Sequence, residues 1–587
     1  MNIPRLVAFS FLIANLLLAA APAKPNFILV LVDDLGATDL GCYGSTFHQT
    51  PHLDRLASQG MRFTQAYSAC TVCSPTRAAF LTGKYPARLH ITDWIEGHKR
   101  PFAKLKVPEW TMHLPLQERT FATHLRTAGY ATASIGKWHL GGESFAPEKH
   151  GFDINRGGTH KGQPPSYFSP YRISTLPDGP NGEHLTDRES AEALKFIEKN
   201  KDRPFVIYLP HHAVHTPLQA KKEVVEKYRA RIKPGAGQTN AVYAALLESV
   251  DDSIGRIMTK LDELKIADRT VILFTGDNGG LLGPTSNTPL RAGKGSTYEG
   301  GVRVPLIVKW PGVTALNSTN HTPVMSIDFH PTLLDIAGIK PAADQVMDGV
   351  SIVPLLRGST NAARALFWHY PHYHPGGASP YGAIRDGDFK LIEYYEDGRQ
   401  ELFNLKDDPR ENASLTEKQP AKAIALSQKL DAWRRHVGAQ MPLPNPDYRP
   451  NPQAADGSIL LHSRVAEVHG TMLRYEPQPN KNTLGYWVKA EDWASWEFTV
   501  LKPGTFTLEI LQGCGKGSGG AAVEFAIGEQ VLKMTVEDTG HFQNFVLRDI
   551  GTVKLDKPGK YTLTVRPKTK PGVAVMDLRQ VTLKPVK

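Results

Sequence analysis

The stretch NFILVLVDD at residues 26–34 decides the fold. Its first seven residues, Asn26–Val32, form a nearly continuous apolar run, which is typical of a strand buried on both faces of a parallel sheet. Asp33 and Asp34 follow at the point where this strand ends. We therefore expect an α/β sheet, with polar chemistry at the carboxyl end of this strand.

Predicted strands and helices alternate along the sequence after this first strand. Strands are expected at residues 130–135, 205–209 and 270–274. Helices are expected at residues 52–60, 121–128, 185–200 and 241–264. This alternation predicts a mostly parallel sheet sandwiched by helices, which we expect to occupy residues 24–348.

The chain changes character twice after this α/β part. A small antiparallel α+β subdomain is expected at residues 349–440, because short strands joined by Asp-Gly turns precede a predicted helix at 421–437. A Pro/Asn-rich linker is expected at 441–453. Residues 454–587 alternate like the strands of an all-β sandwich or jelly roll.

The tryptophans of this last part allow two interpretations. Trp487, Trp493 and Trp496 would suit a carbohydrate platform, but the core of the sandwich is the favoured place for most of them. The all-β part resembles appended carbohydrate-binding or accessory domains only in its general form, which is an analogy of fold and not of site.

The N-terminus carries the pattern of a secretory signal peptide. Arg5 precedes an apolar run at residues 6–20, and Ala21-Pro22-Ala23 follows it. We expect residues 1–23 to be removed and the mature protein to be secreted or periplasmic. An uncleaved anchor is the alternative, and no later segment is long enough to span a membrane.

Composition excludes several classes of protein. With 41% hydrophobic and 21% charged residues over 587 residues, the chain is an ordinary globular protein and not disordered, collagenous or coiled-coil. The net charge of +10 favours anionic partners weakly, and it is equally compatible with no such role. The four cysteines are too few for a disulfide scaffold, and Cys70-x-x-Cys73 has no second pair that would complete a zinc site.

Polar residues follow four of the predicted strands. They are Asp33-Asp34, Gly136-Lys137-Trp138-His139, His211-His212-Ala213-Val214-His215 and Asp277-Asn278. Asp33-Asp34 alone would also suit a helix cap, but two acidic groups from separate strands repel each other unless a cation joins them. Carboxylate and amide oxygens suit a hard ion such as Ca²⁺ or Mg²⁺.

A helix start is predicted at Cys73-Ser74-Pro75-Thr76-Arg77, with Ser74 as its cap and Gly83 as its end. Cys73 would then lie at a helix N-terminus, which favours an anion. As a bare thiol it would be a nucleophile of low pKa, and a buried structural cysteine is the alternative.

These segments resemble the type I, formylglycine-dependent sulfatases, an arylsulfatase-like family of the alkaline phosphatase superfamily. Cys73–Arg77 with Leu81-Thr82-Gly83-Lys84 resembles the family's C-x-P-x-R and T-G-[KR] motifs, and Gly136–Gly141 resembles its second signature. Further matches are the lysine-bearing segment at 293–301, the calcium ligands Asp33, Asp34, Asp277 and Asn278, and His215-Thr216-Pro217. The resemblance covers residues 25–440 in family order, and it implies a sulfuric ester hydrolase.

The resemblance implies a role for each site residue. A formylglycine-generating maturation enzyme would oxidise Cys73 to an aldehyde. The hydrated aldehyde would attack sulfur and form a covalent sulfo-enzyme. An ion beside it would be held by Asp33, Asp34, Cys73, Asp277 and Asn278. Lys137 and Lys294 would neutralise the sulfate, and Arg77 would hold the diol and the ion-binding loop. His215 would protonate the leaving alcohol, and His139 would remove the proton whose loss expels sulfate.

The substrate is less clear from the sequence. The loop that ends at Tyr370-Pro371-His372-Tyr373-His374 suits contact with a sugar or a plain loop core, and His372 is the expected substrate contact. His160 is the candidate for a further polar residue of the site. His211 and His212 suit either packing or substrate binding. Basic charge, secretion and the β part together favour a sulfated polysaccharide over nucleic acid.

Two other functions stay open. The related phosphonate and phosphodiester hydrolases share the cysteine motif but typically place a histidine after the second metal aspartate, where this chain has Asn278. A glycan-binding protein with a dead catalytic domain is the other alternative, and the complete set of motif residues argues against it.

Overall fold

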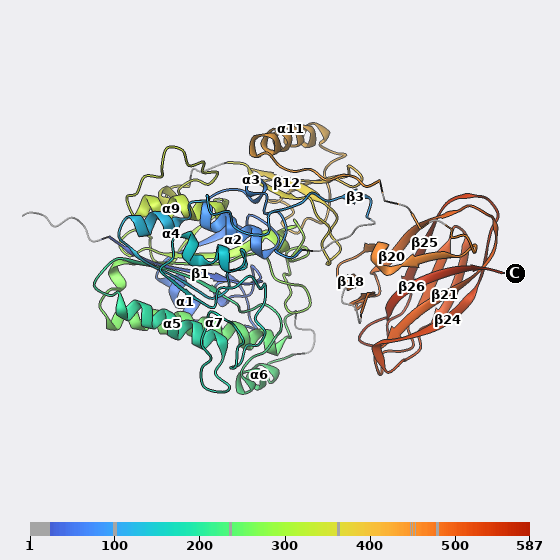
Figure 1. The fold of residues 1–587 in the computed structure, drawn as a ribbon, viewed down its shortest axis with the longest axis horizontal. Coiled ribbons are helices and arrows are strands. Elements are labelled where there is room, and N and C mark those ends of the chain that lie inside the picture. Colours follow the sequence, from blue (N-terminus) through green and yellow to red (C-terminus); the bar gives the residue numbers. More distant parts are fainter. Residues whose placement is uncertain are drawn as a thin grey trace, which may run out of the picture.

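The computed structural model describes residues 24–97, 103–233, 237–360, 364–446, 448, 450–451, 453–476 and 481–586. The expected signal peptide at 1–23 lies outside the described residues. The largest sheet has nine strands in the order β10-β2-β8-β7-β1-β6-β4-β5, with β9 beside β2 (Figure 1). The strands are β1 Asn26–Val32, β2 Met61–Tyr67, β4 Ala131–Ile135, β5 Ile154–Arg156, β6 Phe205–His211, β7 Thr270–Gly276, β8 Arg303–Lys309, β9 Ser318–Asn320 and β10 Val324–Met325.

Strand β1 lies at the centre of this sheet because it is apolar on both faces. It runs parallel to β6 on one side and β7 on the other, and all seven of its residues are buried. The predicted mostly parallel sheet is therefore confirmed. Only β8 departs from it, pairing antiparallel with both β2 and β7.

Helices cover both faces of the sheet. Ile28, Val30 and Val32 of β1 pack with α1, α5 and α7, whereas Phe27 and Leu29 pack on the other face with α2, α4 and α9. These helices are α1 Pro51–Ser58, α2 Cys73–Thr82, α4 Phe121–Thr127, α5 Leu185–Lys199, α7 Ala241–Glu263 and α9 Phe329–Ile336. The other helices of this part are α3 Pro86–Leu89, α6 Lys222–Arg229, α8 Glu299–Val302 and α10 Val353–Leu356.

A four-stranded antiparallel sheet and one long helix follow. The strands are β11 Leu366–Tyr370, β12 Tyr381–Asp386, β13 Phe389–Tyr394 and β14 Gln400–Asn404, and the helix is α11 Pro420–Val437. Trp368 and Tyr381 of this sheet share a hydrophobic core with Val72, the residue before α2, and with Ala79 within α2. The small sheet therefore supports the segment that carries Cys73. Beyond α11, β15 Leu443–Pro444 pairs with β3 Leu105–Lys106.

The C-terminal part is a β-sandwich of two antiparallel sheets, as expected. One sheet has the order β18-β19-β26-β21-β24 with β16 beside β26, and the other has the order β17-β20-β25-β22-β23. Trp487 and Trp496 are buried in the shared core, so they form no carbohydrate platform. The strands are β16 Ile459–His462, β17 Glu467–His469, β18 Arg474–Glu476, β19 Thr483–Gly485, β20 Trp493–Val500, β21 Gly504–Cys514, β22 Ala522–Ile527, β23 Gln530–Thr535, β24 His541–Leu555, β25 Gly559–Pro567 and β26 Asp577–Pro585.

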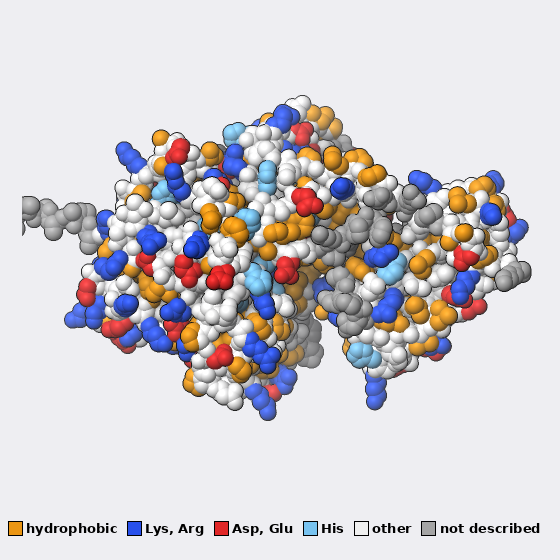
Figure 2. All heavy atoms as spheres, viewed as in Figure 1, with side chains coloured by type: hydrophobic (Ala, Val, Ile, Leu, Met, Phe, Trp, Pro, Cys, Tyr) orange, Lys and Arg blue, Asp and Glu red, His pale blue; other side chains and the backbone are white. Residues whose placement is uncertain are grey.

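The distribution of charge on the surface agrees with the interpretation that the net charge favours anionic partners only weakly. Figure 2 shows basic and acidic side chains mixed over the visible face of the α/β part. All four cysteines are free. Among the described residues, no helix is both long and apolar enough to cross a membrane.

Candidate active site

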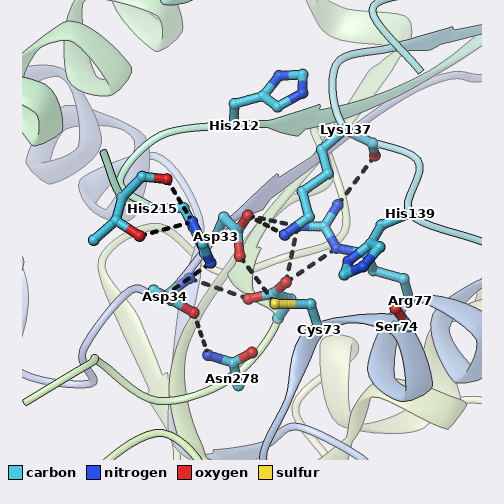
Figure 3. A network of polar contacts seen from close by, with 12 residues as sticks. Asp33, Asp34, Cys73, Ser74, Arg77, Lys137, His139, His212, His215 and Asn278 are labelled. Atoms are coloured by element: carbon cyan, nitrogen blue, oxygen red, sulfur yellow. Dashed lines mark hydrogen bonds and ion pairs between the residues drawn. The ribbon is translucent and has the colours of Figure 1, made fainter. Parts of the chain in front are cut away.

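The polar residues predicted at the strand ends lie together above the carboxyl edge of the large sheet (Figure 3). Val32, the last residue of β1, pairs with His211 of β6 and Gly276 of β7, so the segments that leave these strands begin side by side. The N-terminus of α2 enters from one side and brings Cys73 and Arg77, which are one helical turn apart.

An acidic cluster forms the centre of the site. Ligand atoms of Asp33, Asp34, Cys73 and His215 all lie within 4.8 Å of one another. Asn278 Nδ2 donates to Asp34 Oδ1 at 2.8 Å. Within the part of the chain that the structure describes, the buried atoms Asp34 Oδ2 and Asn278 Oδ1 have no hydrogen-bond partner. Two unsatisfied oxygens in an oxygen-rich cluster fit a hard cation such as Ca²⁺ or Mg²⁺.

The charges of the acidic cluster also favour a bound cation. Burial and then repulsion from Asp33 raise the pKa of Asp277 to about 6, although Arg77 lies against it. For Asp34, burial opposes ionisation, but Lys294 and His215 hold the pKa of this carboxyl well below its usual range. A bound cation would relieve the mutual repulsion of these carboxylates.

Arg77 connects the acidic cluster to the neighbouring strand end. Its fully buried guanidinium donates from Nε and Nη2 to Asp277 Oδ2 at 3.0 and 2.8 Å, and from Nη1 to the Lys137 carbonyl at 3.1 Å. Asp277 Oδ1 in turn accepts from the backbone N–H of Asp34 at 3.1 Å. This network fixes the loops after β1, β4 and β7 relative to one another.

Cys73 lies between two lysines. Lys294 Nζ is 3.4 Å from Cys73 Sγ and 2.6 Å from Asp34 Oδ1, and Lys137 Nζ is 2.5 Å from Asp33 Oδ2. The Cys73 thiol itself lies 3.4 Å from Asp33 Oδ1. The position beside Cys73 therefore combines two ammonium groups with the acidic cluster.

The prediction of a low pKa for the bare Cys73 thiol is wrong. Burial and the nearby Asp33 raise its pKa to about 12, and these effects exceed the attraction of Lys137 and Lys294. The predicted cap was also wrong, because α2 begins at Cys73 with Val72 as the N-cap residue, and Ser74 Oγ accepts from the Ile95 N–H instead. Gly83 ends the helix in a left-handed conformation, as expected.

The two candidate catalytic histidines have different hydrogen bonds. His139 has φ +56°, and its Nε2 lies 3.2 Å from the Ile95 carbonyl, while its buried Nδ1 has no partner among the described residues. His215 Nδ1 lies 2.7 Å from the Thr216 carbonyl. Since each of these nitrogens must donate to its carbonyl, the free lone pair is at Nδ1 of His139 and at Nε2 of His215.

Burial affects both histidines in the same direction. Burial and the charge of Lys294 lower the pKa of His215 to about 3, and its Nε2 lies 3.7 Å from Asp34 Oδ2. Burial, followed by the charge of Lys137, lowers the pKa of His139 well below its usual range. Both imidazoles are therefore neutral in the free site.

A cavity of about 500 Å³ opens above Cys73. Its lining includes Cys73, His139, His215 and Lys294, which the motifs identified, and His374, the last residue of the loop expected near the substrate. It also includes Trp94, Glu96, Lys161 and Gln163, which sequence reasoning missed. The missed residues lie on loops without any motif. The sequence offered one indication, the His-rich loop at 367–374, and from it His372 and not His374 was expected to contact the substrate.

The other suggested histidines lie outside this cavity lining. His372 is buried and does not line the cavity, and its Nε2 lies 2.8 Å from Thr92 Oγ1, whereas His374 of the same loop does line it. His160 is exposed next to Lys161 but does not line the cavity. His211 and His212 are buried, and each has Nδ1 2.6 Å from a carboxylate oxygen of Glu189, which favours a packing role.

Comparison with known families and structures agrees with this geometry. The family model described as Sulfatase matches residues 25–339, and the model described as N-sulphoglucosamine sulphohydrolase, C-terminal, matches residues 293–436. A protein of Formosa agariphila named Sulfatase is 35% identical over 73% of this chain and 93% of its own length. Human N-acetylgalactosamine-6-sulfatase is 34% identical over 60% of this chain and 72% of its own.

Solved structures share the same fold. The crystal structure of Ps i-CgsB in complex with k-i-k-neocarrahexaose superposes with a TM-score of 0.61 at 29% identity, over 70% of this chain and 92% of that one. The phosphonate monoester hydrolase of Agrobacterium radiobacter, at 20% identity and a TM-score of 0.54, shares the fold alone. The chain belongs to the sulfatase family and is a sulfuric ester hydrolase.

Proposed function

We propose that this sulfatase removes a sulfate ester from a sulfated carbohydrate, using a formylglycine made from Cys73 and a bound Ca²⁺ or Mg²⁺. The observation that carries the proposal is the position of Cys73, which is buried near Lys137 and Lys294 and lies beside the acidic cluster of Asp33 and Asp34. Relatives named N-acetylgalactosamine-6-sulfatase and a neighbour in complex with k-i-k-neocarrahexaose support a carbohydrate substrate.

The raised pKa of the Cys73 thiol supports its conversion to another nucleophile. At neutral pH a thiol with a pKa of about 12 is protonated and attacks poorly, whereas a hydrated aldehyde offers an oxygen. Because Cys73 is only 2% exposed, the maturation enzyme must reach it before α2 packs into the site.

The acidic cluster would hold the ion through Asp33, Asp34, Asp277 and Asn278. When bound, the ion would polarise the sulfate and favour the ionised form of the attacking oxygen at residue 73. Lys137 and Lys294 would attract the remaining sulfate oxygens through their ammonium groups. Arg77 would keep residue 73 and the ion-binding loops in register.

The hydrogen bonds of the two histidines support separate roles in proton transfer. His139 offers a free lone pair at Nδ1, which suits removal of a proton from residue 73. His215 must first gain a proton at Nε2 before it can donate one to the leaving alcohol. The negative charge of a bound sulfate ester favours that protonation, which the free site opposes.

The cavity lining suits a sugar. Trp94 and His374 lie edge to face with ring centroids 5.6 Å apart, and they provide an apolar wall beside Lys294. Lys161, Gln163 and Glu96 provide polar groups for hydroxyl or anionic substituents. Export through the N-terminal signal peptide remains part of the proposal.

The test begins with the chemical state of residue 73. Peptide mass spectrometry on enzyme co-expressed with a maturation enzyme should show an aldehyde at Cys73, and a screen of sulfated mono- and oligosaccharides should then reveal turnover. Enzyme made without maturation is the matched control and should be inactive. Full turnover by enzyme whose Cys73 is demonstrably unmodified would refute the formylglycine.

The ion is tested separately on the mature enzyme. Chelation should remove activity, and Ca²⁺ or Mg²⁺ should restore it better than a soft ion such as Zn²⁺. Elemental analysis of the chelated sample is the control, because full activity in demonstrably metal-free enzyme contradicts the assignment.

A further inference from the structure

Basic side chains lie against aromatic rings on the outer face of one sheet of the β-sandwich. The basic–aromatic patch consists of Arg474, Lys481, Tyr486, Phe545 and Arg579. Tyr475 of β18 and Leu578 of β26 point into the sandwich core, so Arg474 and Arg579, which alternate with them, point outward. We propose that this patch binds a sulfated glycan chain at a second site, separate from the active-site cavity.

The patch is continuous. The Arg474 guanidinium carbon lies 3.5 Å from the centroid of the Tyr486 ring, and Lys481 Nζ lies 5.9 Å from the same centroid. Arg579 packs at 3.7 Å on the ring of Phe545. Arg579 also donates from Nη2 to the Lys481 carbonyl at 2.7 Å, which joins the two stacks into one surface.

Two features leave this surface available for a ligand. Over the part of the chain that the structure describes, the Arg474 guanidinium has neither a hydrogen bond nor an ion pair, so its N–H groups are unused. Tyr486 is 40% exposed and has φ +55°, a conformation that a bulky aromatic residue rarely adopts. Strained residues of this kind cluster at ligand-binding sites.

The charge of the patch selects an anionic ligand. Glu476 is only 7% exposed and is paired with Lys481 at 2.6 Å, while burial and then Glu476 raise the pKa of Asp577 to about 7. The nearby acids are thus buried, whereas Arg474 faces outward. A guanidinium held flat on a ring matches the oxygens of a sulfate, and the ring beside it suits a sugar face.

The position of the patch favours a substrate chain over other polyanions. Met472, two residues before Arg474, has its Cε atom 4.0 Å from the position a Cβ atom would have on Gly283, in the loop that leads to Lys294. Val468 Cγ1 is equally close to the Cβ position of Gly377, three residues after His374. Figure 1 shows β18 on the side of the sandwich nearest the α/β part.

The patch therefore begins beside two loops that carry cavity residues. A sulfated polymer held on it would extend toward the cavity above Cys73, and this reading rests on the proposed function. In Figure 2, basic side chains also stand beside hydrophobic ones on the visible face of the sandwich.

The experiment uses the full-length mature enzyme and two kinds of measurement. Binding of a sulfated polysaccharide, such as a carrageenan, is compared with its desulfated counterpart at low and high salt. Turnover is compared on the same polymer and on 4-nitrophenyl sulfate. Arg474→Glu removes the unused guanidinium, and Tyr486→Gly removes the ring at a position where glycine suits the backbone.

Arg474→Glu should weaken binding of the sulfated polymer by about tenfold, as expected for the loss of a charge-assisted contact. Tyr486→Gly should also weaken it, because the sugar loses the ring on which it would lie. Both variants should leave turnover of 4-nitrophenyl sulfate unchanged. Arg566→Glu is the matched control, because Arg566 stacks at 3.3 Å on Trp493 in the other sheet. It should leave polymer binding unchanged.

The outcomes separate this proposal from the proposed function. Unchanged polymer binding in Arg474→Glu and Tyr486→Gly, or an equal loss in Arg566→Glu, refutes the patch whatever the activity. Equal binding of the desulfated polymer, or tighter binding of duplex DNA, refutes its assignment to a sulfated glycan. Failure of the mature wild-type enzyme to hydrolyse any sulfate ester refutes the proposed function and leaves the binding result to stand by itself.

Discussion

The active site and the basic–aromatic patch use the same kinds of charge in opposite ways. In the active site, Arg77 and Lys137 are fully buried, and each is paired with an aspartate. In the patch, Arg474 lies on an aromatic ring without an acidic partner among the described residues. Chemistry at sulfur requires charges held rigidly away from water, whereas binding a polymer requires charges that remain accessible. The two regions should therefore respond very differently to mutation.

The largest effect is expected at residue 73. Cys73→Ser should lower turnover of every sulfate ester by roughly 10⁵-fold or more, because the nucleophile can no longer be regenerated as an aldehyde. At best the mutant should be sulfated once and then stall. Polymer binding at the patch should be unchanged, measured by titration with the sulfated polysaccharide. Steady turnover by this mutant would contradict the formylglycine hypothesis.

Asp277→Ala should abolish activity and also destabilise the α/β part. It leaves the buried Arg77 without its main partner, and breaking a buried ion pair typically costs about 3–5 kcal/mol. Hydrogen exchange measured by mass spectrometry should therefore increase in peptides from β1 and β7 and stay unchanged in β21 and β26. Asp556→Asn, at an exposed ion pair in the sandwich, is the control. Faster exchange in both parts would show that they do not unfold independently.

The third prediction separates the two histidines within the active site. His215→Ala should reduce kcat/KM for a sugar sulfate by about 10²–10⁴-fold and spare an aryl sulfate, because a phenolate leaves without an acid. His139→Ala should slow both substrates together and leave sulfate on the protein, which intact mass would reveal. Equal losses for both substrates in His215→Ala, with sulfate trapped there, would reverse the two roles.

The sequence predicted which polar residues meet at one edge of the large sheet, because its local patterns are strong. The apolar run of β1 fixes a buried parallel strand, and polar residues after β1, β4, β6 and β7 must then meet at one edge of the sheet. The C-x-P-x-R motif placed Cys73 and Arg77 one helical turn apart. These predictions needed no knowledge of tertiary contacts.

Other features depended on contacts between distant segments. The antiparallel pairing of β8 follows from neighbours that no local pattern reveals. The helix N-terminus suggested a low pKa for Cys73, but burial and Asp33 exceed that effect. In the loop at 367–374, His372 is held by a hydrogen bond with Thr92, a distant residue, while His374 lines the cavity. The basic–aromatic patch combines residues from three segments and has no motif at all.

The smallest effect is expected in the sandwich, where Asp577 lies beside the patch. Burial and then Glu476 raise the pKa of Asp577 to about 7, while Gln543, Lys481 and Arg579 partly offset this. The folded state therefore binds a proton that the unfolded state has released, and the free energy of unfolding should fall as pH rises from about 4 to 7.

Asp577→Asn should remove this dependence, because an amide stays neutral in both states. We expect the wild-type sandwich to lose on the order of 2 kcal/mol between pH 5 and pH 7, because nearly one proton more is bound to the folded state than to the unfolded state over most of this range. Hydrogen exchange in β26, corrected for the intrinsic effect of pH, should show the loss in the wild type and not in the variant. The ion site should not contribute to it, because its carboxylates lie in the other part of the molecule. A wild-type sandwich that becomes more stable over this range would show that Asp577 is ionised in the folded protein and held by Lys481 and Arg579.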